Sequence, residues 1–271
     1  MTYFGYLAGF LGIPLLIVGG LTVFDRQRGR RAPTFIGGRA QLVGLAAHVI
    51  LAVAYTTPWD NYLVATRVWW YDPNLVSGLV LGWVPVEEYT FFVLQTILMG
   101  LWLLVLARRL SPASRVSRPS ALRWSTSLVG AIIWLSAVVA LVVGWRPGTY
   151  LALELAWAIP PIILQMGFGA DILWRHRRLL AVSILSATLY LAFTDALAIS
   201  AGTWTIDPAQ SLHLLLAGVL PLEEAIFFLL TNTLVGFGMT LILAPQSLDR
   251  LPPSLSRRLA RLMGMEDAVG L

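Results

Sequence analysis

Long apolar runs dominate this chain, and each is about as long as a helix that crosses a lipid bilayer. Hydrophobic residues make up 58% of its 271 residues and charged residues only 12%, with a mean hydropathy of +0.76. Backbone polar groups in a hydrocarbon core must be hydrogen-bonded within the chain. Runs of ~20 apolar residues without the polar–apolar alternation of barrel strands therefore fold there as helices. We therefore predict an all-α integral membrane protein without a soluble domain. The seven predicted helices cover residues 3–24, 40–57, 78–106, 125–145, 150–173, 179–201 and 212–244.

Arginine is concentrated in alternate loops, which predicts how the chain is oriented. Clusters lie between the first and second predicted helices, the third and fourth, and the fifth and sixth, and in the tail. The opposite loops contain little positive charge beyond Arg67 and Arg146. By the positive-inside rule, we expect a multi-pass protein of the cell membrane with its N terminus outside and its C terminus in the cytoplasm. The interleaved basic and aromatic residues of a nucleic-acid-binding surface are missing from the sequence.

One unusual string occurs twice, as PVEEYTFF at residues 85–92 and as PLEEAIFF at residues 221–228. Asp60 precedes the first glutamate of its string by 27 residues, and Asp195 precedes its own by 28. Agreement this close indicates an internal repeat. Equivalent predicted helices are four apart in the chain, so the two repeats cross the membrane in the same direction.

The repeat predicts how the chain is divided. Three predicted helices form each repeat, and the fourth predicted helix joins them. The expected units are a first repeat at 1–110, a linker with the joining helix at 111–149, a second repeat at 150–245 and a basic cytoplasmic tail at 246–271.

The paired acids have both an ordinary and a functional interpretation. Proline followed by acids is a common helix start. However, apolar residues also precede each proline, so the helix is expected to begin or break within the membrane, where charge is costly. Asp60 and Asp195, each expected to end the preceding helix on the same side, fit catalysis or turn capping equally. Polar and aromatic residues follow the acids at helical spacing: Phe91, Phe92 and Gln95 in the first copy, and Phe227, Phe228, Thr231 and Asn232 in the second.

The chain resembles the membrane-integral lycopene cyclases of carotenoid biosynthesis, of the heterodimeric type and here in fused form. The resemblance rests on TPWDNYLV, VWWYDP and PVEEYTFFVLQT in the first half and on FTDALAI, GTWTIDP and LPLEEAIFFLLTNTLVGFG in the second. It implies that the ψ-end of an acyclic, lycopene-like carotenoid is converted to a β-ionone ring without net redox change. It also implies contacts with membrane lipid and with other enzymes of carotenoid biosynthesis.

The residue types suit this cyclisation. It needs a proton donor for a terminal alkene carbon, a carbocation shielded from water, and a base that removes a proton after ring closure. Carboxyl groups in a low-dielectric site supply both donor and acceptor. The expected catalytic residues are Glu87, Glu88, Glu223, Glu224, Asp60 and Asp195.

Aromatic and amide side chains complete the predicted site. We expect Phe91, Phe92, Phe227, Phe228, Trp70 and Trp204 to stabilise the cation through their ring faces, although the tryptophans fit an interfacial belt equally well. Gln95, Thr231 and Asn232 are expected to orient the carboxylates or to form hydrogen bonds between helices. No cofactor motif or metal-ligand cluster is present in the sequence, so neither is expected.

The sequence also bears on other classes of membrane protein. The chain has no lysine for a retinal Schiff base, and its three histidines are scattered, unlike those of a metal oxygenase. A proton-coupled transporter using the acids as a relay, or a Mg²⁺-dependent membrane prenyltransferase, are the alternatives. Product analysis distinguishes them, whereas the ring isomer, the number of cyclised ends, the substrate length, the proton donor and the oligomeric state are left open.

Overall fold

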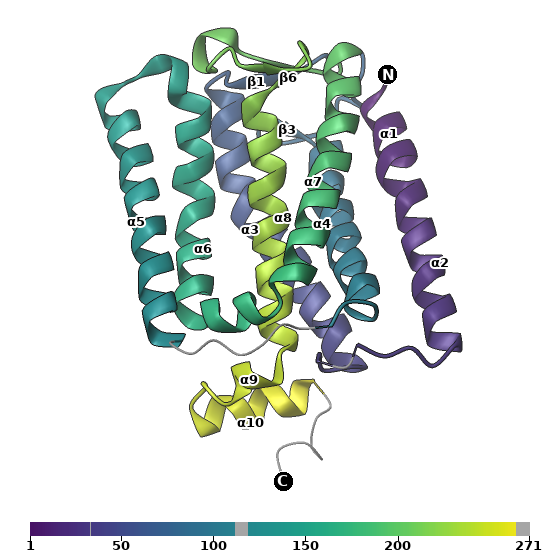
Figure 1. Ribbon diagram of the computed structural model, residues 1–271. Coiled ribbons are helices and arrows are strands. Elements are labelled where there is room, and N and C mark those ends of the chain that lie inside the picture. Colours follow the sequence, from purple (N-terminus) through teal and green to yellow (C-terminus); the bar gives the residue numbers. More distant parts are fainter. Residues whose placement is uncertain (33, 112–118, 264–271) are drawn as a thin grey trace.

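The computed structural model describes residues 1–32, 34–111 and 119–263. Seven helices in these ranges are long and apolar enough to cross a membrane, which confirms the predicted fold class. The first is continuous over Tyr3–Gln27 and is assigned as α1 (Tyr3–Tyr6), a π-helical segment (Leu7–Gly12) and α2 (Ile13–Gln27). The others are α3 (Arg39–Ala65), α4 (Val86–Ala107), α5 (Pro119–Val143), α6 (Thr149–Arg175), α7 (Arg177–Ser200) and α8 (Leu222–Leu243), followed by the short helices α9 (Pro245–Leu248) and α10 (Pro253–Leu262) (Figure 1).

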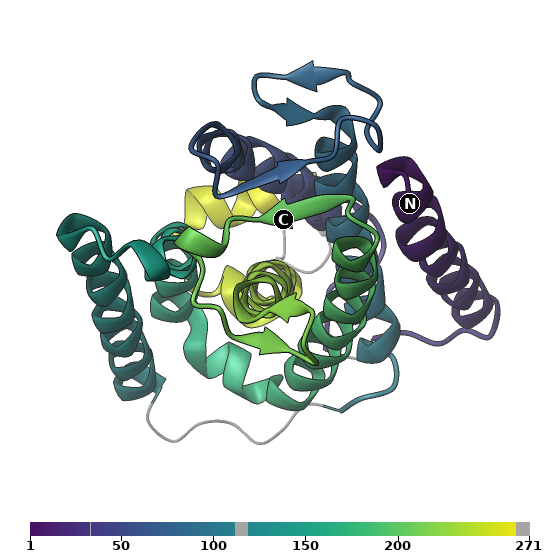
Figure 2. The ribbon, with the colours of Figure 1, turned by 90° about the horizontal axis from the view of Figure 1, so that it is seen from above.

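The two helices that begin with the paired glutamates form the centre of the bundle. Within the most apolar 18-residue stretch of each helix, 67% of the α4 residues and 61% of the α8 residues are buried, compared with 11% of the α5 residues. Seen from above, α8 lies among the other helices, while α2 and α5 lie at opposite edges (Figure 2). Helix α5, the predicted joining helix, packs along α6. The unit boundaries predicted from the sequence stay predictions, and parts of the linker and tail, at 112–118 and 264–271, lie outside the described residues.

The predicted starts of the third and seventh helices, at residues 78 and 212, were wrong. A short hairpin precedes each helix: β2 (Val80–Leu81) pairs with β3 (Val84–Pro85), and β5 (Leu215–Leu216) pairs with β6 (Leu220–Pro221). Gly82 turns the first hairpin at a φ of 72°, and a Cβ there would lie 2.2 Å from the side-chain oxygen of Asn61. Only glycine fits this turn without displacing Asn61.

One of the two preceding helices is longer than predicted. Helix α3 continues through Pro58 to Ala65, past its predicted end at residue 57, whereas α7 ends at Ser200, within one residue of its predicted end. The prediction that Asp60 and Asp195 end these helices was therefore wrong, because both lie inside them. Proline is tolerated within membrane helices, where neighbouring groups bind the backbone atoms that it leaves free.

A two-stranded antiparallel sheet joins the two halves of the chain at the end of the bundle that carries the N terminus. Strand β1 (Trp69–Tyr71) pairs with β4 (Trp204–Ile206), and Trp70 lies opposite Thr205. Each strand comes from the loop that follows the second long helix of its half, α3 or α7. In the view from above, these two strands lie side by side (Figure 2).

At the other end of the bundle, one buried acid ties α2 to α4. The Asp25 carboxylate lies 2.9 Å from a guanidinium nitrogen of Arg109, 3.2 Å from Arg30 and 3.5 Å from Arg108, and Asp25 is fully buried. Removing one partner of such a cluster leaves the opposite charges without compensation.

We expect Asp25→Ala to lower the thermal unfolding midpoint in detergent by about 5 °C or more, because three arginines lose their shared acceptor. The exposed Asp249 is the control, and Asp249→Ala is expected to leave the midpoint nearly unchanged. Equal midpoints for the two variants would show that the Asp25 cluster adds nothing to stability.

Candidate active site

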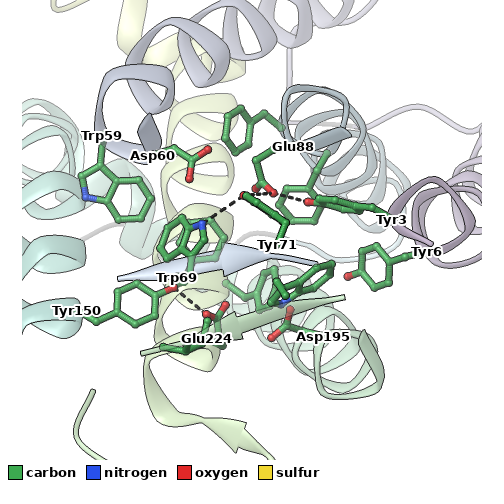
Figure 3. Close-up of a pocket in the computed structure, with 16 residues that line it drawn as sticks. Tyr3, Tyr6, Trp59, Asp60, Trp69, Tyr71, Glu88, Tyr150, Asp195 and Glu224 are labelled. Atoms are coloured by element: carbon green, nitrogen blue, oxygen red, sulfur yellow. Dashed lines mark hydrogen bonds between the residues drawn. The ribbon is translucent and has the colours of Figure 1, made fainter. Parts of the chain in front are cut away.

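A small cavity lies beneath β1 and β4, where α4 and α8 begin (Figure 3). It encloses about 40 Å³, and four carboxyl groups line it: Asp60 of α3, Glu88 of α4, Asp195 of α7 and Glu224 of α8. The structure thus brings together four of the six acids that the sequence predicted as catalytic. We call this space the acid cavity. Its other lining residues are Tyr3, Tyr6, Trp59, Trp69, Tyr71, Phe91, Phe92, Tyr150, Trp204, Ile206, Phe227 and Phe228.

Two phenol groups bind Glu88. The hydroxyls of Tyr3 and Tyr71 both donate to its Oε2, the second at 3.0 Å (Figure 3). The Tyr71 oxygen also accepts a hydrogen bond of 3.2 Å from the indole nitrogen of Trp69. Burial, together with the nearby Glu88 charge, raises the pKa of Tyr71 well above its usual range. Tyr71 therefore keeps its proton and remains a hydrogen-bond donor to Glu88.

Glu224 has different surroundings. Its Oε1 accepts one hydrogen bond, of 2.8 Å, from the Tyr150 hydroxyl. Glu154 lies one turn beyond Tyr150 on the same face of α6, is fully buried, and has no hydrogen-bond partner for either oxygen among the described residues. Glu88 thus binds two phenols, whereas Glu224 binds one and lies near a further carboxyl group.

The first glutamate of each pair lies outside the acid cavity. Oε1 of Glu87 accepts a hydrogen bond of 2.6 Å from the backbone N–H of Ser77, and Oε1 of Glu223 accepts one of 2.7 Å from that of Leu212. Both glutamates are fully buried. They hold equivalent loops, each just before a hairpin, so the adjacent acids of each pair have different structural surroundings.

Asp60 and Asp195, the repeated aspartates, lie in the wall of the acid cavity, with exposed fractions of 1% and 2%. Neither oxygen of Asp60 has a hydrogen-bond partner among the described residues, and neither does Oδ2 of Asp195. Turn capping is a poor account of these side chains, because each is buried within a helix.

Five of the six predicted aromatic residues line the acid cavity, and Trp70 does not. Side chains alternate along a strand, so Trp69 and Tyr71 face the cavity while Trp70 faces the other way. The Trp70 ring instead lies 5.8 Å from the guanidinium carbon of Arg67. Strand β4 alternates in the same way, with Trp204 and Ile206 lining the cavity.

The predicted polar residues bond between helices below the cavity. Gln95 donates a hydrogen bond of 2.8 Å to Thr231, joining α4 to α8, and Asn232 donates one of 3.2 Å to Thr188 of α7. Gln95 and Thr231 each follow their cavity glutamate by seven residues, about 10 Å along the helix. They do not contact the carboxylates. Within the described residues, no group of three or more acids or histidines is arranged to hold a metal ion.

Comparison with known proteins identifies the family. The lycopene beta-cyclase of Halobacterium salinarum is 37% identical over 240 residues, which cover 89% of this chain and 95% of that protein. This chain belongs to the lycopene cyclase family. The bifunctional lycopene cyclase/phytoene synthase of Podospora anserina is 34% identical over 74% of this chain and 35% of its own length, and that of Colletotrichum graminicola is 36% identical over 84% and 38%. No family model and no solved structure matches the chain.

Membership of the lycopene cyclase family confirms the resemblance noted in the sequence. The sequence did not predict a role at the site for Tyr3, Tyr71, Tyr150 or Glu154. A lone acid within an apolar run was a signal for Glu154. Tyr3 and Tyr150 stand near the start of the first helix in each repeat, but nothing in their spacing shows that each donates to the glutamate of its own half.

Proposed function

We propose that this chain is a lycopene β-cyclase, which converts the ψ-end of an acyclic carotenoid to a β-ionone ring by acid–base chemistry without a cofactor. The main support is the gathering of four buried carboxyl groups around one cavity walled by aromatic rings. The names of the related proteins support the same substrate. The arginine-rich loops support a location in the cell membrane with the N terminus outside.

The proposed reaction needs no oxidant, because one proton enters and one leaves. A carboxylic acid protonates the terminal alkene carbon, and the resulting cation is attacked by a second double bond as the ring closes. A carboxylate then removes a proton next to the cationic carbon, which forms the ring double bond. Phe91 and Phe228, 6.3 Å apart between ring centres, and the stacked rings of Trp59 and Phe227, 6.0 Å apart, offer faces and edges around the cation.

We assign the acceptor to Glu88 and the donor to Glu224. Two phenol hydroxyls stabilise a carboxylate at Glu88, which is the form that a base requires. Glu224 has one such donor, and it lies close enough to a second buried carboxyl group, Glu154, for their charges to interact. Two buried carboxyl groups close together favour sharing a proton, which is the form that an acid requires. After each turnover the proton passes back from Glu88 to Glu224 across the acid cavity, with Asp60 and Asp195 in its wall.

Expression of this chain in a lycopene-accumulating host tests the function. We expect a β-cyclised carotenoid in the pigment extract, identified by chromatography, because both repeats contribute acids to the cavity. The Glu88→Gln, Glu224→Gln double variant is the matched control and is expected to leave lycopene unchanged. Unchanged lycopene with the wild-type chain, despite its verified presence in the membrane, would overturn the proposal and leave a transporter or prenyltransferase to be tested.

A further inference from the structure

Two apolar grooves flank the central helices α4 and α8. The first, of about 240 Å³, lies between α3 and α6, and we call it the α3–α6 groove. The second, of about 190 Å³, lies between α2 and α7, and we call it the α2–α7 groove. Gln95 lines both. Defining residues of the α3–α6 groove are Ala52, Tyr55, Phe92, Trp157, Pro161 and Phe227. Those of the α2–α7 groove are Pro14, Val18, Met99, Ala187 and Tyr190.

The internal repeat relates the two grooves. Ala52 and Tyr55 lie 135 residues before Ala187 and Tyr190, the same spacing that separates Asp60 from Asp195. The Tyr55 hydroxyl donates to the Trp157 carbonyl oxygen at 2.9 Å, and the Tyr190 hydroxyl donates to that of Phe10 at the same distance. The grooves are therefore equivalent positions in the two halves of the molecule.

Their connection to the acid cavity differs. Phe92 and Phe227 line both the α3–α6 groove and the acid cavity. Their repeat equivalents, Phe228 and Phe91, line the acid cavity but not the α2–α7 groove. Among the described residues, the α2–α7 groove shares no lining residue with the cavity. The α3–α6 groove is thus the one that leads to the carboxyl groups.

The shape of the α3–α6 groove fits a long apolar chain. Trp157 and Phe227 line its end next to the cavity, and Gln165 and Val235, each eight residues further along the same helix, line its far end. The groove therefore follows the helices for about 12 Å. Leu51 and Tyr55 in its wall are 61% and 45% exposed, so it opens sideways on the bundle surface, where lipid surrounds a membrane protein.

The acid cavity by itself is too small for a carotenoid. Its volume of about 40 Å³ leaves room for only a few water molecules, since a cavity needs about 10–15 Å³ to hold one. Only an end group could enter it, after the side chains at its entrance move. The rest of an acyclic carotenoid, an apolar conjugated chain, then has to follow an apolar path that begins at the cavity.

We propose that the polyene chain of an acyclic carotenoid lies in the α3–α6 groove, with its ψ-end passing between Phe92 and Phe227 into the acid cavity; this rests on the proposed function. The substrate enters sideways from the membrane between α3 and α6. The α2–α7 groove does not guide the reacting end. The two ends of one molecule therefore reach the acids one after the other, through the same opening.

The repeat supplies a matched test, because Ala52 and Ala187 are equivalent and both are half-buried. A tryptophan at position 52 fills the α3–α6 groove, and one at position 187 fills the α2–α7 groove. Lycopene is titrated into each purified full-length variant in detergent, and the spectral shift of the carotenoid measures binding. We expect Ala52→Trp to weaken binding about tenfold or more, and Ala187→Trp to leave it unchanged. Cyclisation is measured on the same preparations.

Milder variants control for misfolding: Ala52→Leu and Ala187→Leu add less volume, and Ala52→Leu is expected to weaken binding by a smaller factor. Equal losses at both positions would overturn the choice of groove, as would unchanged binding in Ala52→Trp or a wild-type chain that binds no lycopene. Failure of the proposed function gives a different result: wild-type protein that binds lycopene, loses it in Ala52→Trp, and forms no cyclised product.

Discussion

Replacing Glu224 or Glu88 with glutamine is expected to lower the cyclisation rate about 10²-fold or more, because glutamine keeps the size of the side chain but cannot transfer its proton. The rate is measured as cyclised carotenoid formed per amount of membrane-inserted protein. Tyr150 and the phenols around Glu88 still find an acceptor oxygen in glutamine, so the protein is expected to accumulate at near-normal levels.

Glu87→Gln and Glu223→Gln are the matched controls, since each is the neighbouring residue in the same pair. Their oxygens accept hydrogen bonds from backbone N–H groups of the loops, and a glutamine oxygen accepts them too. We expect a modest loss of stability, about 1 kcal/mol, and much smaller losses of rate. If all four glutamine variants stay active, the repeated acids are helix starts only and the proposed mechanism fails.

Replacing Asp60 with leucine is expected to reduce the cyclisation rate about 10²-fold without lowering the thermal unfolding midpoint. Asp60 is buried without a hydrogen-bond partner among the described residues, so an apolar side chain removes an unfavourable burial. A carboxyl group retained at such a cost is expected to serve the proton path. Thermal melts and rates measured on the same detergent preparation separate the two effects.

Asp72 and Asp207 provide the comparison, because they are 135 residues apart, the spacing that separates Asp60 from Asp195 in the repeat. Asp72 accepts a hydrogen bond of 2.8 Å from the backbone N–H of Asn74, and Asp207 accepts one of 2.9 Å from that of Ala209. Neither lines the acid cavity. We expect Asp72→Asn and Asp207→Asn to leave the rate within a few-fold of wild type. A rate in Asp60→Leu that falls only in step with its unfolding midpoint would assign Asp60 a structural role.

The membrane-spanning helices and the importance of the buried acids were predictable from the sequence, because both follow from the apolar environment of the membrane. A hydrocarbon core requires long apolar helices, and it makes buried acids costly enough to be conspicuous. Asp60, Glu88, Asp195 and Glu224, which line the acid cavity, were predicted on these grounds together with Glu87 and Glu223. The same reasoning could not tell which of Glu87 and Glu88 lines the cavity. Adjacent residues on a helix point in different directions, and only the packing of the neighbouring elements shows which direction leads to the cavity.

Each wrong or missing prediction has its own physical cause. Leu79, Val80 and Leu81 are as apolar as the residues of a membrane-spanning helix, so they were predicted to be helical. The positive φ of Gly82, which turns the chain into a hairpin, cannot be inferred from composition. Trp70 was predicted to line the site, but Trp69 does. Which of two adjacent strand residues faces the cavity depends on how β1 pairs with β4, and the sequence does not show this pairing. Tyr3 and Tyr150 reach their glutamates across 85 and 74 residues, and such long-range pairs require the packed helices.

The sheet formed by β1 and β4 makes the order of synthesis matter for the site. Its two strands are hydrogen-bonded to each other over the acids, and the second, Trp204–Ile206, follows the sixth long helix. While a ribosome is still producing α7, the first half already contains Asp60 and Glu88 but has no partner strand above them. We therefore expect water to reach these acids until the chain has passed residue 206. Closure of the acid cavity is then expected to be a late event in the biogenesis of this protein.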